Sequence, residues 1–119
     1  MVVVASSLLA LVLGLAFTSA GYAKVTDQPV MVRAREQLGV GATTFRAVGM
    51  AEMAGAVGVA IGLIDVFAWV GYVSAFGLLA LMLTAIGVHL QAEDQPQELV
   101  PASVLALLAV AYLAIVAVG

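Results

Sequence analysis

The sequence predicts an all-α protein, a bundle of four transmembrane helices with a short interfacial amphipathic helix between the first and the second. Of its 119 residues, 65 % are apolar and only 9 % are charged, against roughly 45–50 % and about 25 % in soluble domains. Four apolar windows, each long enough to cross about 30 Å of hydrocarbon, are separated by polar segments. The residue alternation of a membrane β-barrel is absent, so we expect helices to span the bilayer.

The four windows account for almost the whole chain, and we expect them to form one domain. The predicted helices cover residues 1–23, 45–64, 66–90 and 101–118. The first window carries no charge and is longer than the apolar region of a signal peptide, so we expect it to be retained as a membrane helix. A tight turn at Asp65 separates the second window from the third. Pro101 suits the first turn of the last helix.

Two polar connectors lie between these helices. In the first connector, residues 24–45, the segment 29–38 places Val30, Met31, Ala34 and Leu38 on one side and charges elsewhere. This pattern predicts an amphipathic helix lying in the membrane interface, with an irregular loop as the alternative. The second connector, residues 91–100, is short and acidic.

The basic residues give the orientation. All four lie in or beside the first connector: Lys24, Arg33, Arg35 and Arg46. By the positive-inside rule, we expect connectors 24–45 and 91–100 to be cytoplasmic and both termini to face outward. Aromatic residues near the helix ends are expected to act as interfacial anchors; these are Tyr22, Phe45, Phe67, Trp69 and Tyr72.

Composition also excludes several classes of function. The net charge of −3 leaves no basic stripe for nucleic acid. With no cysteine, the chain has no thiol nucleophile, redox dithiol or thiolate metal site. A single histidine provides no metal-ligand constellation, so we expect no metal.

Glu52 is the most unusual residue of the predicted spans. It lies about 10 Å inside the second helix by the 1.5 Å rise per residue. Gly49 and Gly55, three residues before and after it, share its face and allow another helix to approach closely. A carboxylate at this depth is expected to point into the bundle and to be protonated, paired with a cation or part of a site.

Four further polar residues are predicted at the same end of the bundle as Glu52: Tyr22, Lys24, Arg46 and His89. Arg46 is six residues from Glu52 and would have to bend across the mouth of the bundle to pair with it. Lys24 and His89 are equally suited as partners. Together the five residues are predicted to line a polar vestibule. One interpretation is a polar cluster that fixes helix packing; the other is a ligand, proton or partner site.

Glycines mark the predicted packing surfaces of the second helix. Gly58 and Gly62 form a G-x-x-x-G step, and Gly49 and Gly55 precede it. We expect these surfaces to serve the bundle itself, although they are also compatible with a homo-oligomer.

Three motifs occur in order along the chain: G-x-x-K at 21–24, R-x-x-G-x-x-E at 46–52 and G-x-H-L at 87–90. With the Pro29-containing connector, this order resembles the DoxX-like family of small bacterial membrane proteins. The resemblance implies a four-helix protein of the bacterial inner membrane. It also implies that Lys24, Arg46, Glu52 and His89 form a shared polar site. Relatives are linked to thiosulfate:quinone oxidoreductases and to oxidant-scavenging membrane complexes, and a distant relative is an assembly chaperone for membrane receptors.

The leading hypothesis is an accessory or binding subunit of a redox-linked membrane complex. It would engage a partner protein or a lipophilic ligand, a quinone or a lipid, at the vestibule, with Arg46 and Lys24 as donors. One alternative is a quinone-linked oxidoreductase in which Glu52 and His89 relay protons. A second is a small proton-coupled exporter, although the glutamate of such exporters lies in the first helix.

Overall fold

The computed structural model describes residues 2–118, and all regular structure in this range is helical. The long helices are α1 (Val2–Val25), α3 (Ala42–Ile61), α4 (Ala68–Gln91) and α5 (Val100–Val118). The short elements are α2 (Pro29–Leu38) and two 3-10 turns, η1 (Asp65–Phe67) and η2 (Pro96–Leu99). This architecture confirms the predicted all-α fold with a short helix between the first two spans.

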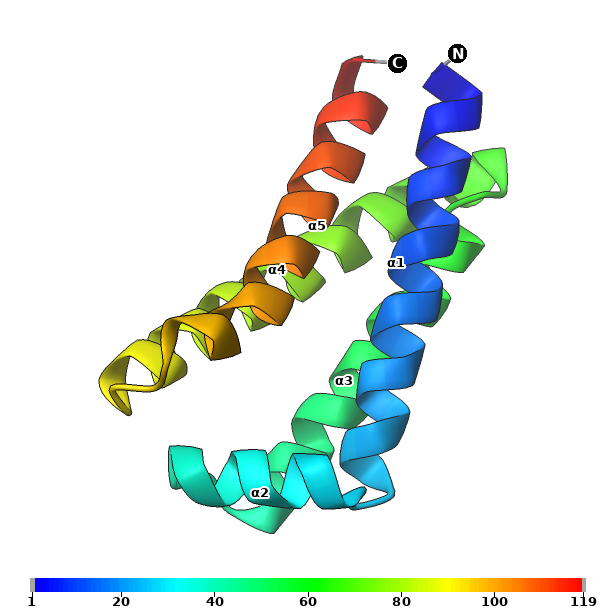
Figure 1. The fold of residues 1–119 in the computed structure, drawn as a ribbon. Coiled ribbons are helices and arrows are strands. Elements are labelled where there is room, and N and C mark those ends of the chain that lie inside the picture. The colour runs from blue at the N-terminus through cyan, green and yellow to red at the C-terminus, as the bar shows by residue number, and fades with distance from the viewer. Residues whose placement is uncertain (1, 119) are drawn as a thin grey trace.

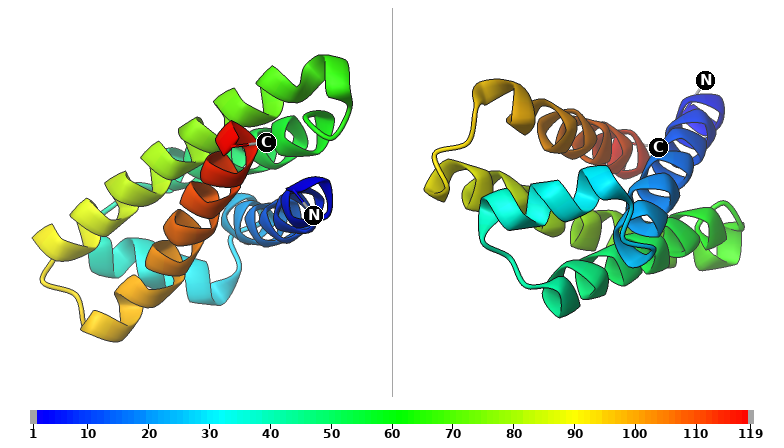
Figure 2. Two further views of the ribbon diagram at one scale, coloured as in Figure 1. Left: turned by 90° about the horizontal axis from the view of Figure 1, so that it is seen from above. Right: turned by 60° about the horizontal axis from the view of Figure 1, so that its bottom comes forward.

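The long helices pack in the order α1, α3, α4, α5, and α5 returns to contact α1. Figure 1 shows α2 crossing one end of the bundle, while both ends of the chain and the α3–α4 turn lie at the other. Seen from above, α5 lies between α1 and α4 (Figure 2). The largest fully buried apolar side chains at the centre are Phe17, Leu13, Leu78 and Val59.

The outer surface of the bundle is apolar. Leu15 on α1 and Leu107 on α5 are 65 % and 69 % exposed. Four helical segments are long and apolar enough to cross a membrane: Val2–Val25, Ala42–Ile61, Asp65–Gln91 and Pro96–Val118. Such a continuous exposed apolar surface needs lipid rather than water around it. The chain is therefore a multi-pass membrane protein.

Helix α2 begins and ends on residues that suit a short helix. Pro29 occupies its first turn, and Gly39 closes it in the left-handed conformation (φ 71°), donating its N–H to carbonyls of the last turn. None of its residues is buried. On its apolar side, Val30 is exposed, whereas Met31, Ala34 and Leu38 are half-buried. A place for α2 in the membrane interface stays a prediction.

Helix bounds differ from the sequence-based ones by up to three residues. The second span begins at Ala42 instead of 45 and ends at Ile61 instead of 64. Gly41 provides the extended residue before the helix, and the chain leaves the helix at Gly62. The turn expected at Asp65 is a 3-10 turn, so α4 begins at Ala68 instead of 66.

Candidate functional site

The candidate site is built where α1 crosses α3. At this crossing, a Cβ added to Gly49 would lie 2.7 Å from the Gly21 carbonyl oxygen and 2.8 Å from Lys24 Cβ. Only glycine therefore fits at position 49 with the helices this close. The missing side chain also leaves room for the stem of Lys24 to lie along α3.

Lys24 and Glu52 form an ion pair inside the bundle. Lys24 Nζ lies 2.7 Å from Glu52 Oε1; the side chain of Glu52 is 0 % exposed and that of Lys24 is 14 % exposed. Neither Glu52 oxygen accepts a hydrogen bond of good geometry within residues 2–118, so charge holds the pair together. Lys24 Nζ also lies 5.5 Å from the centre of the Phe45 ring, within cation–π range. The Glu52 side chain is therefore fully buried, and of the two side chains only that of Lys24 is partly exposed.

A second polar cluster joins the end of α1 to α2 and α3. The Asp27 carboxylate accepts hydrogen bonds from Arg46 Nε (3.2 Å) and Nη2 (2.6 Å) and from Arg35 Nη1 (2.7 Å). Asp27 itself adopts a positive φ of 54° in the turn between α1 and α2. Hydrogen bonds from Arg46 first, and then from Arg35, hold the pKa of Asp27 below its usual value. Arg46 is thus paired with Asp27 rather than with Glu52.

His89 belongs to a third cluster, at the end of α4. Its Nδ1 lies 2.8 Å from Asp94 Oδ2, and both side chains are largely buried, at 16 % and 12 % exposed. Glu93, between them, has a positive φ of 55° that turns the chain back toward His89. The contact closes the polar turn after α4.

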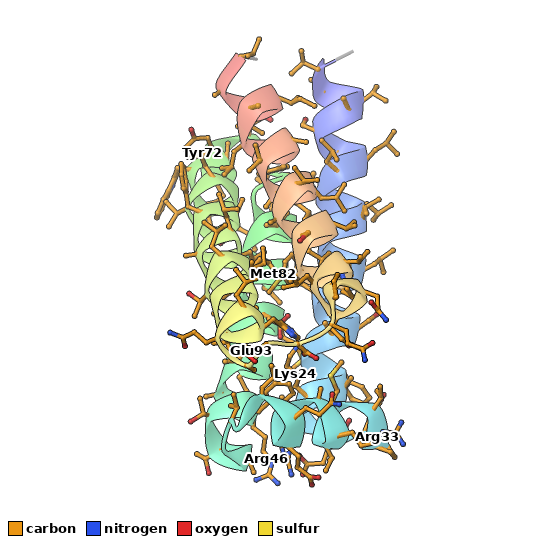
Figure 3. The ribbon with its side chains drawn as sticks, turned by 60° about the vertical axis from the view of Figure 1, so that its left-hand side comes forward. Lys24, Arg33, Arg46, Tyr72, Met82 and Glu93 are labelled. Atoms are coloured by element: carbon orange, nitrogen blue, oxygen red, sulfur yellow. The ribbon has the colours of Figure 1, made fainter. Side chains whose placement is uncertain are left out.

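The five predicted site residues are thus divided among different partners. The structure brings Lys24 and Glu52 together and places Arg46 on Asp27 and His89 on Asp94. Tyr22 is 58 % exposed. Figure 3 shows Lys24 above α2 and Arg46 pointing away from the bundle below it. Within residues 2–118, no hydrogen bond or ion pair joins Arg46 or His89 to Glu52.

Four residues with direct roles in these clusters were not singled out as site residues from the sequence: Asp27, Arg35, Phe45 and Asp94. Phe45 is only 8 % exposed and covers Lys24, so the expectation of a simple interfacial anchor is wrong for this residue. The sequence contained only weak indications that Asp27 and Asp94 take part in these clusters. Asp27 directly precedes the Gln-Pro that opens α2, and Asp94 follows His89 at a spacing of five.

The remaining packing glycines face α4. A Cβ on Gly55 would lie 2.7 Å from Leu78 Cγ, and one on Gly58 would overlap the Ser74 side chain. Near the turn between α3 and α4, a Cβ on Gly62 would lie 2.8 Å from the backbone nitrogen of Gly71. Gly55 and Gly58 thus make room for the side chains of Leu78 and Ser74, and Gly62 lets the two backbones meet at Gly71.

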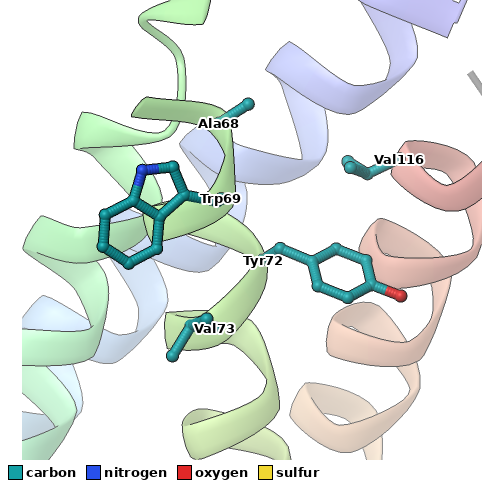
Figure 4. A pocket seen from close by; sticks show the side chains of 5 residues that line it. All are labelled: Ala68, Trp69, Tyr72, Val73 and Val116. Carbon is teal, nitrogen blue, oxygen red and sulfur yellow. The ribbon is translucent and has the colours of Figure 1, made fainter. Parts of the chain in front are cut away.

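Two open hollows lie elsewhere on the surface. One, of about 300 Å³, is lined by Ala68, Trp69, Tyr72, Val73 and Val116 (Figure 4). The other, of about 370 Å³, lies between α3 and α4 and is lined mainly by small residues. Neither includes Lys24 or Glu52. Among residues 2–118, no group of three or more histidine, aspartate or glutamate side chains is placed to hold a metal ion.

A family model, that of the DoxX-like family, matches residues 8–112. The match includes all three polar clusters and spans parts of all four long helices. No curated protein and no solved structure matches the chain. Because the family match covers most of the sequence, the chain belongs to the DoxX-like family.

Proposed function

We propose that this protein is a binding subunit of a redox-linked complex in the bacterial inner membrane, and that it holds a lipophilic molecule by its polar head at Lys24. The observation that carries the proposal is the asymmetry of the Lys24–Glu52 pair. The side chain of Glu52 is fully buried, whereas that of Lys24 is 14 % exposed and lies just above α2 in Figure 3.

The chemistry of the pair fits a ligand that accepts hydrogen bonds. An ammonium group has three N–H donors. Glu52 lies within reach of one and offsets the charge, and the Phe45 ring borders the group on another side. The remaining donor capacity suits a carbonyl or an anionic head group, as in a quinone or a lipid. The apolar exterior of the bundle would contact the rest of such a molecule.

The polar contacts favour binding over proton relay. A relay between Glu52 and His89 needs hydrogen-bonded groups between them. Instead, His89 lies against Asp94, and Glu52 lies against Lys24. We therefore propose that Glu52 is a positioning residue that orients Lys24, and that any redox chemistry takes place on a partner subunit.

The test is native mass spectrometry of the protein extracted gently from its own membrane, followed by organic extraction of co-purifying small molecules. Wild type is compared with Lys24→Met/Glu52→Gln, which removes both charges together and leaves no unpaired buried ion. Asp65→Asn is the matched control, since it removes an exposed carboxylate at the opposite end of the bundle.

We expect a defined quinone or lipid to accompany wild type and Asp65→Asn and to be lost from the double variant. Equal recovery from all three folded proteins would overturn the proposal and leave the pair as part of the helix packing. Glu52→Gln alone is expected to weaken retention without preventing membrane insertion.

A further inference from the structure

The cluster around Asp27 contains more positive than negative charge. Two guanidinium groups, those of Arg35 and Arg46, donate to the single carboxylate of Asp27. One carboxylate balances one of the two cations, so the cluster keeps an excess positive charge. Such a group attracts a second anion.

The two arginines also keep unused donors. A guanidinium has five N–H groups. Arg46 uses Nε and Nη2 on Asp27, and Arg35 uses Nη1. Within residues 2–118, the other guanidinium nitrogens make no hydrogen bond. The Arg46 side chain is 45 % exposed and that of Arg35 is 16 % exposed. Asp27 holds both groups in place, so little side-chain freedom is lost when an anion binds.

The position of the cluster identifies the class of anion. α2 crosses the end of the membrane-spanning helices α1 and α3, which is the level of lipid head groups. Segment 24–46 contains four basic and two acidic residues. The other connector at this end carries Glu93, Asp94 and Glu98 and would repel an anion. Phosphate is the abundant anion at this depth.

We propose that Arg46 and Arg35 bind the phosphate group of an anionic phospholipid. The planar fork of arginine matches phosphate geometry with paired N–H donors. The bound lipid would hold α2 against the membrane surface. This site is separate from the Lys24–Glu52 pair and does not depend on the function proposed for it.

The test is lipid titration of the purified protein followed by native mass spectrometry, with phosphatidylglycerol as probe and phosphatidylcholine as competitor. Wild type is compared with Arg46→Gln and Arg35→Gln. Arg33→Gln is the matched control. Arg33 lies on α2 together with Arg35, is exposed, carries the same charge and forms no ion pair within residues 2–118. Thermal unfolding of each variant verifies that it is folded.

We expect Arg46→Gln or Arg35→Gln to weaken phosphatidylglycerol binding about tenfold more than Arg33→Gln, because a charge-assisted hydrogen bond is lost. An equal loss in all three variants would overturn the proposal in favour of diffuse surface charge. Inorganic phosphate is titrated in parallel. If it binds wild type but not Arg46→Gln while phosphatidylglycerol does not bind, the ligand is free phosphate, and the assignment to a lipid is overturned.

The two proposals fail independently. Loss of lipid from Arg46→Gln with the Lys24 ligand retained supports the phosphate site alone. Loss of the ligand from Lys24→Met/Glu52→Gln with phosphatidylglycerol binding retained supports the proposed function alone.

Discussion

Gly49 lies so close to Gly21 that a Cβ placed on Gly49 would be 2.7 Å from the Gly21 carbonyl oxygen. Each glycine is followed three residues later by a member of the buried ion pair, Lys24 on α1 and Glu52 on α3. Residues three apart lie on one face of a helix. The close crossing therefore sets the register that brings the ammonium to the carboxylate, and helix packing and the candidate site form one unit.

Gly49→Ala is expected to destabilise the protein by about 1–3 kcal/mol, because the added methyl group meets backbone of the facing helix. The free energy of unfolding in detergent micelles measures this loss. Gly77→Ala is the control, since a Cβ at Gly77 meets nothing within 4 Å. Alanine there is expected to be neutral or to stabilise the helix by up to about 1 kcal/mol. Similar losses in both variants would contradict the role assigned to the crossing.

Lys24→Met is expected to cost about 3–5 kcal/mol of unfolding free energy, because it leaves the buried Glu52 carboxylate without a cation. The double variant Lys24→Met/Glu52→Gln is expected to recover most of this loss, since no buried charge is left unpaired. A double-mutant cycle in the same detergent gives the coupling between the two side chains. Additive effects of the two single changes would show that they do not interact.

The number of spans and the short helix between the first two were predictable because both depend on local patterns. Apolar windows of sufficient length predict spans, and Pro29 with Gly39 brackets the short helix. Glu52 was also identifiable, since a carboxylate at that depth stands out in any apolar helix. These features need no knowledge of how the helices pack.

The pairing of the polar residues was not predictable in the same way. Three candidate partners of Glu52 lie at one end of the bundle: Lys24, Arg46 and His89. The sequence alone does not show which of them contacts Glu52. The pairing of Lys24 with Glu52 depends on the Gly21–Gly49 crossing. The pairing of Arg46 depends on Asp27, which has a positive φ and lies 19 residues before Arg46 in the sequence. Both are tertiary features.

Acid is expected to remove the contribution of Asp27 to stability. Arg46 and Arg35 hold the pKa of this carboxyl below its usual value near 3.8. A carboxyl whose pKa is lower in the folded state stabilises the fold above its unfolded pKa, and this contribution is lost as pH falls through the folded pKa. Asp27→Asn should therefore lower Tm at neutral pH, and its difference from wild type should shrink below about pH 4.

The measurement is Tm against pH for both proteins in the same detergent. Asp65→Asn removes an exposed carboxylate that forms no ion pair within residues 2–118, and it is expected to follow wild type throughout. A Tm difference for Asp27→Asn that stays constant down to strongly acidic pH would show that the arginines do not act through the charge of Asp27.

Orientation in the membrane is testable with single cysteines, because the natural chain has none. Gln37 on α2 and Val66 in the α3–α4 turn are both exposed and lie at opposite ends of the bundle. The positive-inside rule predicts that α2 lies at the cytoplasmic face of the membrane. A membrane-impermeant maleimide added from the periplasmic side should thus label Val66→Cys and leave Gln37→Cys unlabelled, with the reverse pattern in inverted vesicles. Leu15→Cys, exposed on the apolar surface of α1, should stay unlabelled in both, since hydrocarbon disfavours the reactive thiolate. Labelling of Gln37→Cys from the periplasm would contradict the predicted orientation and move the proposed phosphate site to the outer leaflet.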